Sequence, residues 1–438
     1  MVNLLKSMNN KFLLKFDWFT FLVYFALVAI GLINIYSIGH TQEESMLSLN
    51  HTFGKQLFFG LLSIGLIFFL QFPKVKVYER YSSIFYLIIL ALLIVLFVFG
   101  KEVSGAKSWY SIAGFSFQPA EFAKVITALA LTKHLSEINT DLTTLSDQLT
   151  SFVLIFLPAL IILPQPDPGS TVVFLSFLLV LHTEKLPSQY LLSCIGLIVL
   201  FIMTLLIGNT MATSIVLGLG LVYIVGLDRK RRRKRLLSTL LTLVLASAFV
   251  QSVDFVFENV FEQRHRDRFN IVLGREVDTQ GIGYNINQSQ IAIGSGGVLG
   301  KGFLEGTQTK GNFVPEQQTD YIFTTVGEEW GFVGSFVVVV LFMILMLRIL
   351  LTSRRQKNNF SKIYCYCVVC LLFAHFSINL GMVLGLLPTI GIPLPYLSYG
   401  GSNLLAFSLL LGIYLKLDAN RVNLSLIHIS EPTRPRLI

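Results

Sequence analysis

The sequence predicts an all-α protein that crosses a membrane many times. Of its 438 residues, 53% are hydrophobic and 13% are charged, whereas a soluble globular domain has about 25% charged residues. Apolar runs long enough to cross a hydrocarbon core of about 30 Å also recur along the whole chain. About twelve transmembrane helices are therefore expected, at roughly 18–38, 53–70, 81–99, 118–134, 150–164, 169–183, 188–207, 211–226, 236–253, 321–349, 361–387 and 396–416.

The first run, Trp18 to Ile38, has no small-residue cleavage signal after it, so it is expected to remain as a span. Positive charges then indicate the orientation, because cytoplasmic loops carry an excess of Lys and Arg. With residues 1–17 as a cytoplasmic N-terminus, every strong basic cluster falls in the cytoplasm, including Arg229–Arg235. The net charge of +9 therefore indicates topology and not a nucleic-acid partner.

The region 150–183 contains two short apolar runs separated by Pro164–Ser170, and one of these spans is expected to be tilted or broken. The largest extracytoplasmic segment then runs from Asp254 to Asp320, which is too long for a simple connection. Apolar residues recur through this loop, so it is expected to pack on the membrane domain. It is rich in glycine between Gly281 and Gly311, and such a segment can present backbone N–H groups to a phosphate.

The same loop carries basic residues on the side of the membrane where positive charge is normally sparse. They are Arg264, Arg266, Arg268, Arg275, Lys301 and Lys310. One interpretation is a pyrophosphate site, because Arg side chains bind phosphate oxygens in pairs. The alternative is that these residues pair with the carboxylates of their own loop. Gly300-Lys301 is not part of a Walker A loop, since Ser295 and Gly302 stand where that motif needs glycine and Ser or Thr.

Ionisable residues at the ends of spans are costly and often functional. Glu121 and Lys124 open the span at 118–134, and their i, i+3 spacing places both on one helix face. They are expected either to pair only with each other or to face a substrate in a polar cavity. Asp320 lies at the outer boundary, where the loop 254–320 enters the span at 321–349, and is either a helix N-cap or a functional carboxylate. Glu328 lies two turns deeper and is expected to pair with a base.

Cysteine and histidine positions do not indicate a metal site. The cysteines all lie in apolar runs and are expected to be small buried residues, at Cys194, Cys365, Cys367 and Cys370. His134, His182 and His375 lack neighbours at metal-ligand spacing and are expected to be structural.

Seven segments, in this order, resemble the motifs of the shape, elongation, division and sporulation (SEDS) family. They are Gly105–Tyr110, Phe117–Lys124, Gln165–Ser170, Gly283–Gly297, Gly300–Gln308, Phe313–Asp320 and Gly391–Ser402. The resemblance covers about 18–416, which is taken as one membrane domain, and the segment 300–308 is most similar to the elongation branch of the family.

This resemblance implies a peptidoglycan glycosyltransferase that polymerises lipid II into glycan strands at the outer face of the bacterial cytoplasmic (inner) membrane during cell elongation. Asp320 matches the family's essential loop aspartate and is the expected catalytic residue. Trp109 matches a required tryptophan, and Glu121 with Lys124 matches the family's polar cavity pair. Together with Arg266, Arg268 and Lys301 from the basic loop, these form the expected substrate-binding set.

The family also implies a divalent cation, Mg²⁺ or Mn²⁺, and the sequence has no carboxylate cluster to hold it. The ion is therefore expected to be carried by the substrate pyrophosphate. Expected partners are lipid II, the growing glycan strand, a class B penicillin-binding protein transpeptidase and other membrane proteins of the elongation complex. A lipid II flippase, a division-type polymerase and a non-catalytic scaffold remain as alternatives.

The chain differs from the family pattern in several places. Members of the family usually have ten spans, so the surplus pair near 188–235 is expected to be an insertion. Residues 417–423 are expected to form a cytoplasmic C-terminus, and residues 424–438 read like the translation of a transposase sequencing adapter. Five motif positions also differ from the usual residues: Ser108, Pro168, Ser170, Gln317 and Gln318.

Overall fold

The computed structural model describes residues 16–40, 47–103, 106–112, 115–259, 261, 263–274, 282–311 and 313–430. Most of the expected cytoplasmic N-terminus, Arg275 and residues 431–438 of the expected adapter-like tail lie outside the described residues. The chain divides into two compact units. The first contains the residues up to Leu186 and from Ile286 onward, and the second contains Pro187–Asn285.

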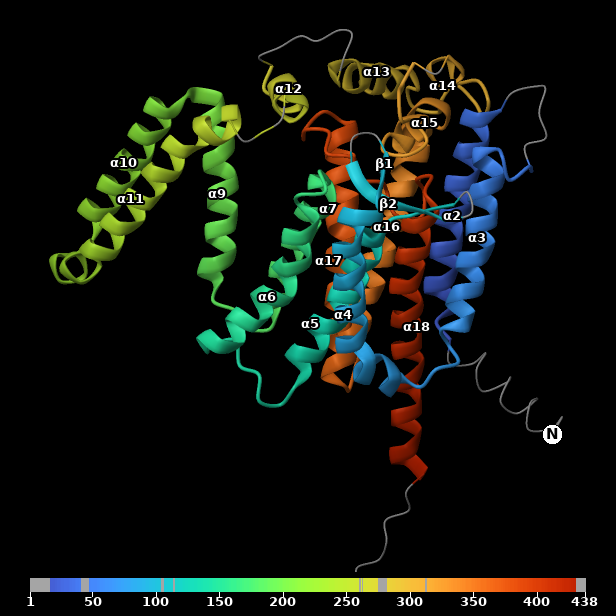
Figure 1. Ribbon diagram of the computed structural model, residues 1–438, viewed down its shortest axis with the longest axis horizontal. Helices are drawn as coiled ribbons and strands as arrows, with labels where there is room; N and C mark the ends of the chain where they lie inside the picture. Colours follow the sequence, from blue (N-terminus) through green and yellow to red (C-terminus); the bar gives the residue numbers. More distant parts are fainter. Residues whose placement is uncertain are drawn as a thin grey trace, which may run out of the picture. The chain divides into compact units, whose positions relative to one another are not determined.

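The first unit is a helical membrane domain (Figure 1). Its N-terminal part consists of α2 (Trp18–Gly39), α3 (Thr52–Phe69), α4 (Val75–Phe99), α5 (Pro119–Ser136), α6 (Leu145–Ile162), α7 (Pro168–Val173), the 3₁₀ turn η1 (Phe174–Ser176) and α8 (Phe177–Thr183). Its C-terminal part consists of α14 (Thr307–Lys310), α15 (Ile322–Glu329), α16 (Gly331–Ser353), α17 (Asn359–Val383) and α18 (Gly401–Ser430), preceded by most of α13 (Ile282–Ser295).

Helices from the two ends of the chain form one core. The last helix, α18, packs on α3, α5 and α17, and α2 packs on α3, α15 and α16. Gly31 allows α2 to approach the backbone of Leu397 closely, because a Cβ atom at position 31 would lie 2.6 Å from the Leu397 carbonyl oxygen. The segment 391–400 is therefore pressed against α2, and any larger residue at position 31 would push it away.

Ten helices of the described residues are long and apolar enough to cross a membrane: α2, α3, α4, α6, α9 (Ser188–Ile207), α10 (Asn209–Gly226), α11 (Arg229–Asn259, of which Arg233–Asn259 is the apolar part), α16, α17 and α18. The other two expected spans are also helical. The helix at 118–134 is α5, which is more polar because it carries Glu121 and Lys124. The span at 169–183 is interrupted by η1, which confirms the expected break in this region.

A small antiparallel sheet lies between α4 and α5 and was not expected from the apolar pattern. It has the strand order β1 (Lys101–Val103), β2 (Ala106–Ile112) and β3 (Phe115–Phe117). Lys101 pairs with Trp109 across the first two strands, and Tyr110 pairs with Phe117 across the second two. The sheet fixes the backbone around Trp109 just before α5 begins.

The second unit contains α9, α10, α11, α12 (Gln263–Val272) and the first residues of α13. Leu205, Val253 and Phe257 form a buried apolar cluster in it, and Phe201, Phe249 and Phe269 are among the residues packed around this cluster. Helix α11 continues beyond the expected span end at 253, as far as Asn259. The long loop 254–320 is consequently divided, with its first part in the second unit and residues 286–320 in the first.

Candidate active site

Three of the seven motif segments meet at the start of α5. The side-chain amide of Gln118 donates to Asp167 Oδ2 at 2.8 Å, and the Gln118 backbone N–H donates to Ser402 Oγ at 3.1 Å. Asp167 also caps α7 by accepting from the Ser170 backbone N–H at 3.0 Å. A Cβ atom on Gly169 would lie 2.6 Å from the carbonyl oxygen of Ile390. The segments around 118, 167 and 390–402 therefore touch through backbone and side-chain contacts.

Glu121 and Lys124 form a buried ion pair on α5, with 2.7 Å between Lys124 Nζ and Glu121 Oε1. The two residues are only 3% and 1% exposed. Asn403 Nδ2 donates to the other Glu121 oxygen at 3.0 Å, and Lys124 Nζ lies 3.0 Å from His375 Nε2. His375 Nδ1 faces the Pro393 carbonyl oxygen at 3.1 Å, so the ring donates through Nδ1 and accepts from Lys124 through Nε2. The pairing expected from the i, i+3 spacing is confirmed.

Helix α17 connects this ion pair to the loop that carries Asp320. Asn379 lies one helical turn after His375, and its side-chain amide donates to the carbonyl oxygens of Asp320 at 2.8 Å and Ile392 at 2.7 Å. Since His375 contacts Pro393 and Asn379 contacts Ile392, both side chains hold the same segment. Asn379 is completely buried. Its hydrogen bonds therefore fix the position of the Asp320 backbone along α17.

Asp320 lies in a half-buried turn two residues before α15. The N-cap residue of α15 is Tyr321, so the alternative interpretation of Asp320 as the N-cap is wrong. A Cβ atom on Gly391 would lie 3.4 Å from Asp320 Oδ2, which places the carboxylate against the Gly391 backbone. Gly391 has a φ of +73°, a conformation that favours glycine. Trp109 is half-buried on β2.

Lys301 and Glu328 form a second ion pair, with 2.8 Å between Lys301 Nζ and Glu328 Oε1. Glu328 is completely buried and also accepts from the backbone N–H groups of Gln308 and Thr309 at 2.8 and 2.9 Å. Burial alone would raise the pKa of Glu328, but hydrogen bonds from Lys301, Gln308 and Thr309 outweigh it and hold the pKa below its ordinary value of 4.5. Glu328 therefore has the basic partner expected from the sequence, and Lys301 is not an unpaired cation.

We expect Glu328→Gln to lower the free energy of unfolding by about 3 kcal/mol, the low end of the range for breaking a buried pair, because Lys301 keeps partial access to solvent. The lowered pKa means that the carboxylate stabilises the fold above about pH 4.5 and that this stabilisation disappears as the pH falls through the lowered value. Thermal unfolding across a pH series measures both effects. Glu305→Gln, the same change at an exposed carboxylate of the same loop, is the matched control; equal unfolding of the two variants would contradict the prediction.

The expected arginines lie in the second unit. Arg266 on α12 donates to the Glu258 carbonyl oxygen at 2.9 Å and to Gln263 Oε1 at 2.7 Å. Arg268 is half-buried on the same helix. These arginines stay candidates for substrate binding, whereas Trp109, Glu121, Lys124, Lys301 and Asp320 all belong to the first unit.

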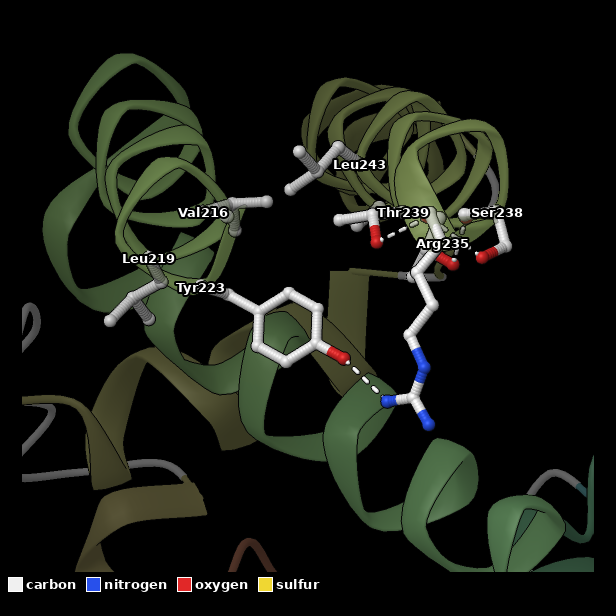
Figure 2. Close-up of a pocket in the computed structure, with 10 residues that line it drawn as sticks. Val216, Leu219, Tyr223, Arg235, Ser238, Thr239 and Leu243 are labelled. Carbon is white, nitrogen blue, oxygen red and sulfur yellow. Dashed lines mark hydrogen bonds between the residues drawn. The ribbon is translucent and has the colours of Figure 1, made fainter. Parts of the chain in front are cut away.

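An open hollow of about 590 Å³ lies between α10 and α11 in the second unit (Figure 2). Arg235 Nη1 donates to the Tyr223 hydroxyl at 3.0 Å across it. The residues that line it include none of the expected site residues. Within the described residues, no group of three or more His, Cys, Asp or Glu side chains could hold a metal ion.

Sequence reasoning missed Asn379 and Asn403 and assigned His375 only a structural role. A signal was present, since an Asn within an apolar span is costly unless its amide is paired. Buried Gln317 was noted only as a departure from the family pattern. Its amide donates to Thr309 Oγ1 at 3.0 Å and to Thr325 Oγ1 at 2.9 Å, so this residue ties the segment before Asp320 to α14 and α15.

Comparison with known proteins agrees with this arrangement. The family model described as cell cycle protein, FtsW/RodA/SpoVE, matches residues 17–209 and 182–423. The peptidoglycan glycosyltransferase MrdB of Escherichia coli K12 is 32% identical over 84% of this chain and 86% of its own length. The peptidoglycan glycosyltransferase RodA of Treponema pallidum is 30% identical over 93% of this chain and 98% of its own.

A solved structure described as a peptidoglycan synthase complex that coordinates polymerization and crosslinking contains a chain with the same fold. The TM-score is 0.69 at 24% identity, covering 93% of this chain and 98% of that chain. The chain therefore belongs to the FtsW/RodA/SpoVE family of cell cycle proteins, as a multi-pass membrane peptidoglycan glycosyltransferase of the RodA and MrdB type.

Proposed function

We propose that this protein polymerises lipid II into glycan strands at the outer face of the bacterial cytoplasmic membrane during cell elongation. The observation that carries the proposal is the position of Asp320. Its half-buried carboxylate lies against Gly391, and its backbone is connected through Asn379 and the 391–393 segment to His375 and the buried Lys124–Glu121 pair. A carboxylate at the outer boundary of the membrane domain suits a lipid-linked donor and a polymer that leaves on the outside.

Asp320 is proposed as the general base. It removes the proton from the acceptor sugar hydroxyl while that oxygen attacks the anomeric carbon of the donor. A new glycosidic C–O bond forms, the C–O bond to the pyrophosphate breaks, and the bond electrons leave with the pyrophosphate. A single displacement of this kind converts an α-linked donor into a β-linked product, so no covalent enzyme intermediate is required.

Charge at the site supports a requirement for a divalent cation. Lys124 is paired with Glu121 and Lys301 with Glu328, so neither pair has net charge to neutralise a departing pyrophosphate. Within the described part of the chain, the side chains do not supply a three-ligand metal site. We therefore propose that Mg²⁺ or Mn²⁺ arrives bound to the pyrophosphate oxygens, where it neutralises charge on the leaving group.

Exhaustive treatment with EDTA is expected to abolish polymerisation, and added Mg²⁺ or Mn²⁺ is expected to restore it. Because the ion is proposed to bind the substrate, the thermal unfolding midpoint of the protein without substrate should be the same with and without EDTA. Full polymerisation after EDTA treatment would contradict the cation requirement. A large EDTA-induced loss of stability would instead indicate a metal site in the protein.

Proposed partners are lipid II, the growing strand, a class B penicillin-binding protein transpeptidase and other membrane proteins of the elongation complex. The fold match to a chain from a complex that couples polymerization to crosslinking supports the transpeptidase as a partner. Co-purification with a tagged transpeptidase from the same cells tests this assignment.

The decisive experiment incubates the purified protein with lipid II and measures glycan polymer on a gel. Polymer formation supports the proposal. The same protein in vesicles separates the alternatives, because translocation of lipid II without polymer would identify a flippase. Neither polymer nor translocation, with a transpeptidase partner present, would favour a scaffold.

A further inference from the structure

The hollow between α10 and α11 includes the last residue of a long basic run. Seven consecutive basic residues, Arg229–Arg235, begin α11, and the excess of positive charge places them in the cytoplasm. Asp228 is the only acidic residue between positions 209 and 253. A basic run of this length next to a membrane span attracts the anionic lipids of the inner leaflet. The charge of this turn therefore fits a lipid ligand.

Two accessible donor groups meet at the cytoplasmic end of the hollow (Figure 2). Arg235 Nη1 donates to the Tyr223 hydroxyl at 3.0 Å, and both side chains are exposed, so a ligand in the hollow reaches them. The Tyr223 hydroxyl keeps its own hydrogen to donate, and the guanidinium keeps most of its N–H groups. In the part of the chain that the structure describes, Arg235 belongs to none of the ion pairs, so its charge is not neutralised by a carboxylate.

The hollow is apolar farther from the cytoplasmic turn. Val216 and Leu219 of α10 face Leu243 and Ala246 of α11 there. Val216 lies two helical turns deeper than Tyr223, about 10 Å into the membrane. Leu219 is 66% exposed, so the hollow is open at its side to a lipid chain.

The hydroxyls along the α11 wall do not provide further donors. Ser238 and Thr239 both donate to the Arg235 carbonyl oxygen at 2.9 Å. The donors available to a ligand are therefore those of Arg235 and Tyr223, at one end of an otherwise largely apolar hollow. A guanidinium binds phosphate oxygens in pairs, and the tyrosine hydroxyl can donate to the same group. A zwitterionic headgroup would bring its own ammonium toward the basic run, so a headgroup with net negative charge fits better.

We propose that this hollow binds one anionic glycerophospholipid of the inner leaflet. Its phosphate accepts hydrogen bonds from Arg235 and Tyr223, and one acyl chain lies between Val216 and Leu243. The volume of about 590 Å³ lies within the range of small-ligand sites. The site lies within the second unit and does not depend on Asp320 or on the proposed reaction.

The consequence is that a lipid bridges the two helices of this hairpin. In α10, all of whose residues the structure describes, only Ala212 and Gly220 are buried, so protein contacts alone cover little of this helix. Lipid occupancy should raise the unfolding midpoint, since a ligand that binds only the folded state stabilises it.

The test compares phosphatidylglycerol, which is anionic, with phosphatidylcholine of the same acyl chains. Each is added to delipidated full-length protein in about 0.5 M ammonium acetate, where charges more than about 5 Å apart are largely screened. Native mass spectrometry measures the fraction of protein with one bound lipid. Phosphatidylglycerol is expected to bind about tenfold more tightly and to raise the unfolding midpoint more. Equal binding of the two lipids would overturn the proposal.

Arg235→Gln should weaken binding of phosphatidylglycerol about tenfold, the effect of losing a charge-assisted hydrogen bond. Arg233→Gln is the matched control, because it makes the same charge change at an exposed residue of the same run that does not line the hollow. It should weaken binding less than about twofold in this buffer. Since Arg235 is exposed, the unfolding midpoint without lipid should be the same in both variants. Equal losses of binding would overturn the site, because diffuse attraction by the basic run would then explain them.

Ala246→Phe fills the apolar part of the hollow without changing its charge and should also weaken binding of phosphatidylglycerol. Ala248→Phe, at an exposed position of the same helix outside the hollow, is the matched control and should not. Displacement of the lipid by millimolar inorganic phosphate would overturn the proposal, because the occupant would then be a soluble anion. Loss of a co-purified transpeptidase from Ala246→Phe, with no preference for the anionic lipid, would also overturn it, because the hollow would then dock a partner helix. The comparison of the two lipids stands even if Ala246→Phe fails to fold.

Discussion

Asp320→Asn is expected to leave the protein folded and to lower glycan polymerisation by at least roughly 10²–10⁴-fold, the contribution that acid–base catalysis typically supplies. Asparagine keeps the size of the side chain and its ability to accept a hydrogen bond through Oδ1, but it does not take up the proton of the acceptor hydroxyl. The hydrogen bond from Asn379 to this turn uses the Asp320 carbonyl oxygen, which the substitution keeps. Folding should therefore survive.

The measurement is the rate of polymerisation per amount of folded protein, across a Mg²⁺ series. Asp320→Ala should be as inactive as Asp320→Asn, because it also lacks the carboxylate, and it removes no N-cap, because Tyr321 occupies the N-cap position of α15. Glu316→Gln, the same kind of change at an exposed carboxylate of the same turn, should keep its activity. Partial rescue of Asp320→Asn by high Mg²⁺ would instead assign Asp320 to the metal ion. Near-wild-type turnover would end the general-base assignment.

Local features of the site could be predicted from the sequence. Glu121 and Lys124 are three residues apart on one helix, so spacing alone predicts their contact. The break between residues 164 and 176 also follows from local residues, because three prolines and a glycine interrupt the apolar pattern there. The membrane class follows from composition, since so few charged residues exclude a soluble domain.

The remaining contacts depend on how distant helices pack. Asn403 reaches Glu121 from α18, and His375 reaches Lys124 from α17, and no periodicity within one helix indicates either contact. The N-cap interpretation of Asp320 failed by a single residue, which is within the usual uncertainty of helix boundaries. The three short strands around Trp109 were missed because they lie in a connecting loop outside the apolar runs.

The loop cations illustrate a different limit. Sequence places Lys301 among basic residues that could bind phosphate, but the structure pairs it with Glu328, 27 positions later. The sequence also predicts that Glu328 pairs with a base, but it does not indicate which one. Charge patterns along a chain therefore predict that a pair exists more easily than they predict which two residues form it.

Lys124→Met is expected to destabilise the protein by about 3–5 kcal/mol, because it leaves the buried Glu121 carboxylate without its cation. His375 would lose the donor to its Nε2 at the same time. The folded fraction should therefore fall, and thermal unfolding in detergent measures the loss. Lys133→Met on the same helix, where the Lys133 amine contacts Ser83 in an exposed position, is the matched control and should cost little.

The double variant Lys124→Met with Glu121→Gln distinguishes a structural pair from a substrate-binding pair. Removing both charges eliminates the unpaired carboxylate, so stability should largely return. If the pair also faces the substrate, the double variant should still polymerise far less lipid II than the wild-type protein when equal amounts of folded enzyme are compared. Recovery of both stability and activity would reduce the pair to a structural role. A single Lys124→Met variant that stays folded and active would remove the structural and the substrate-binding assignments together.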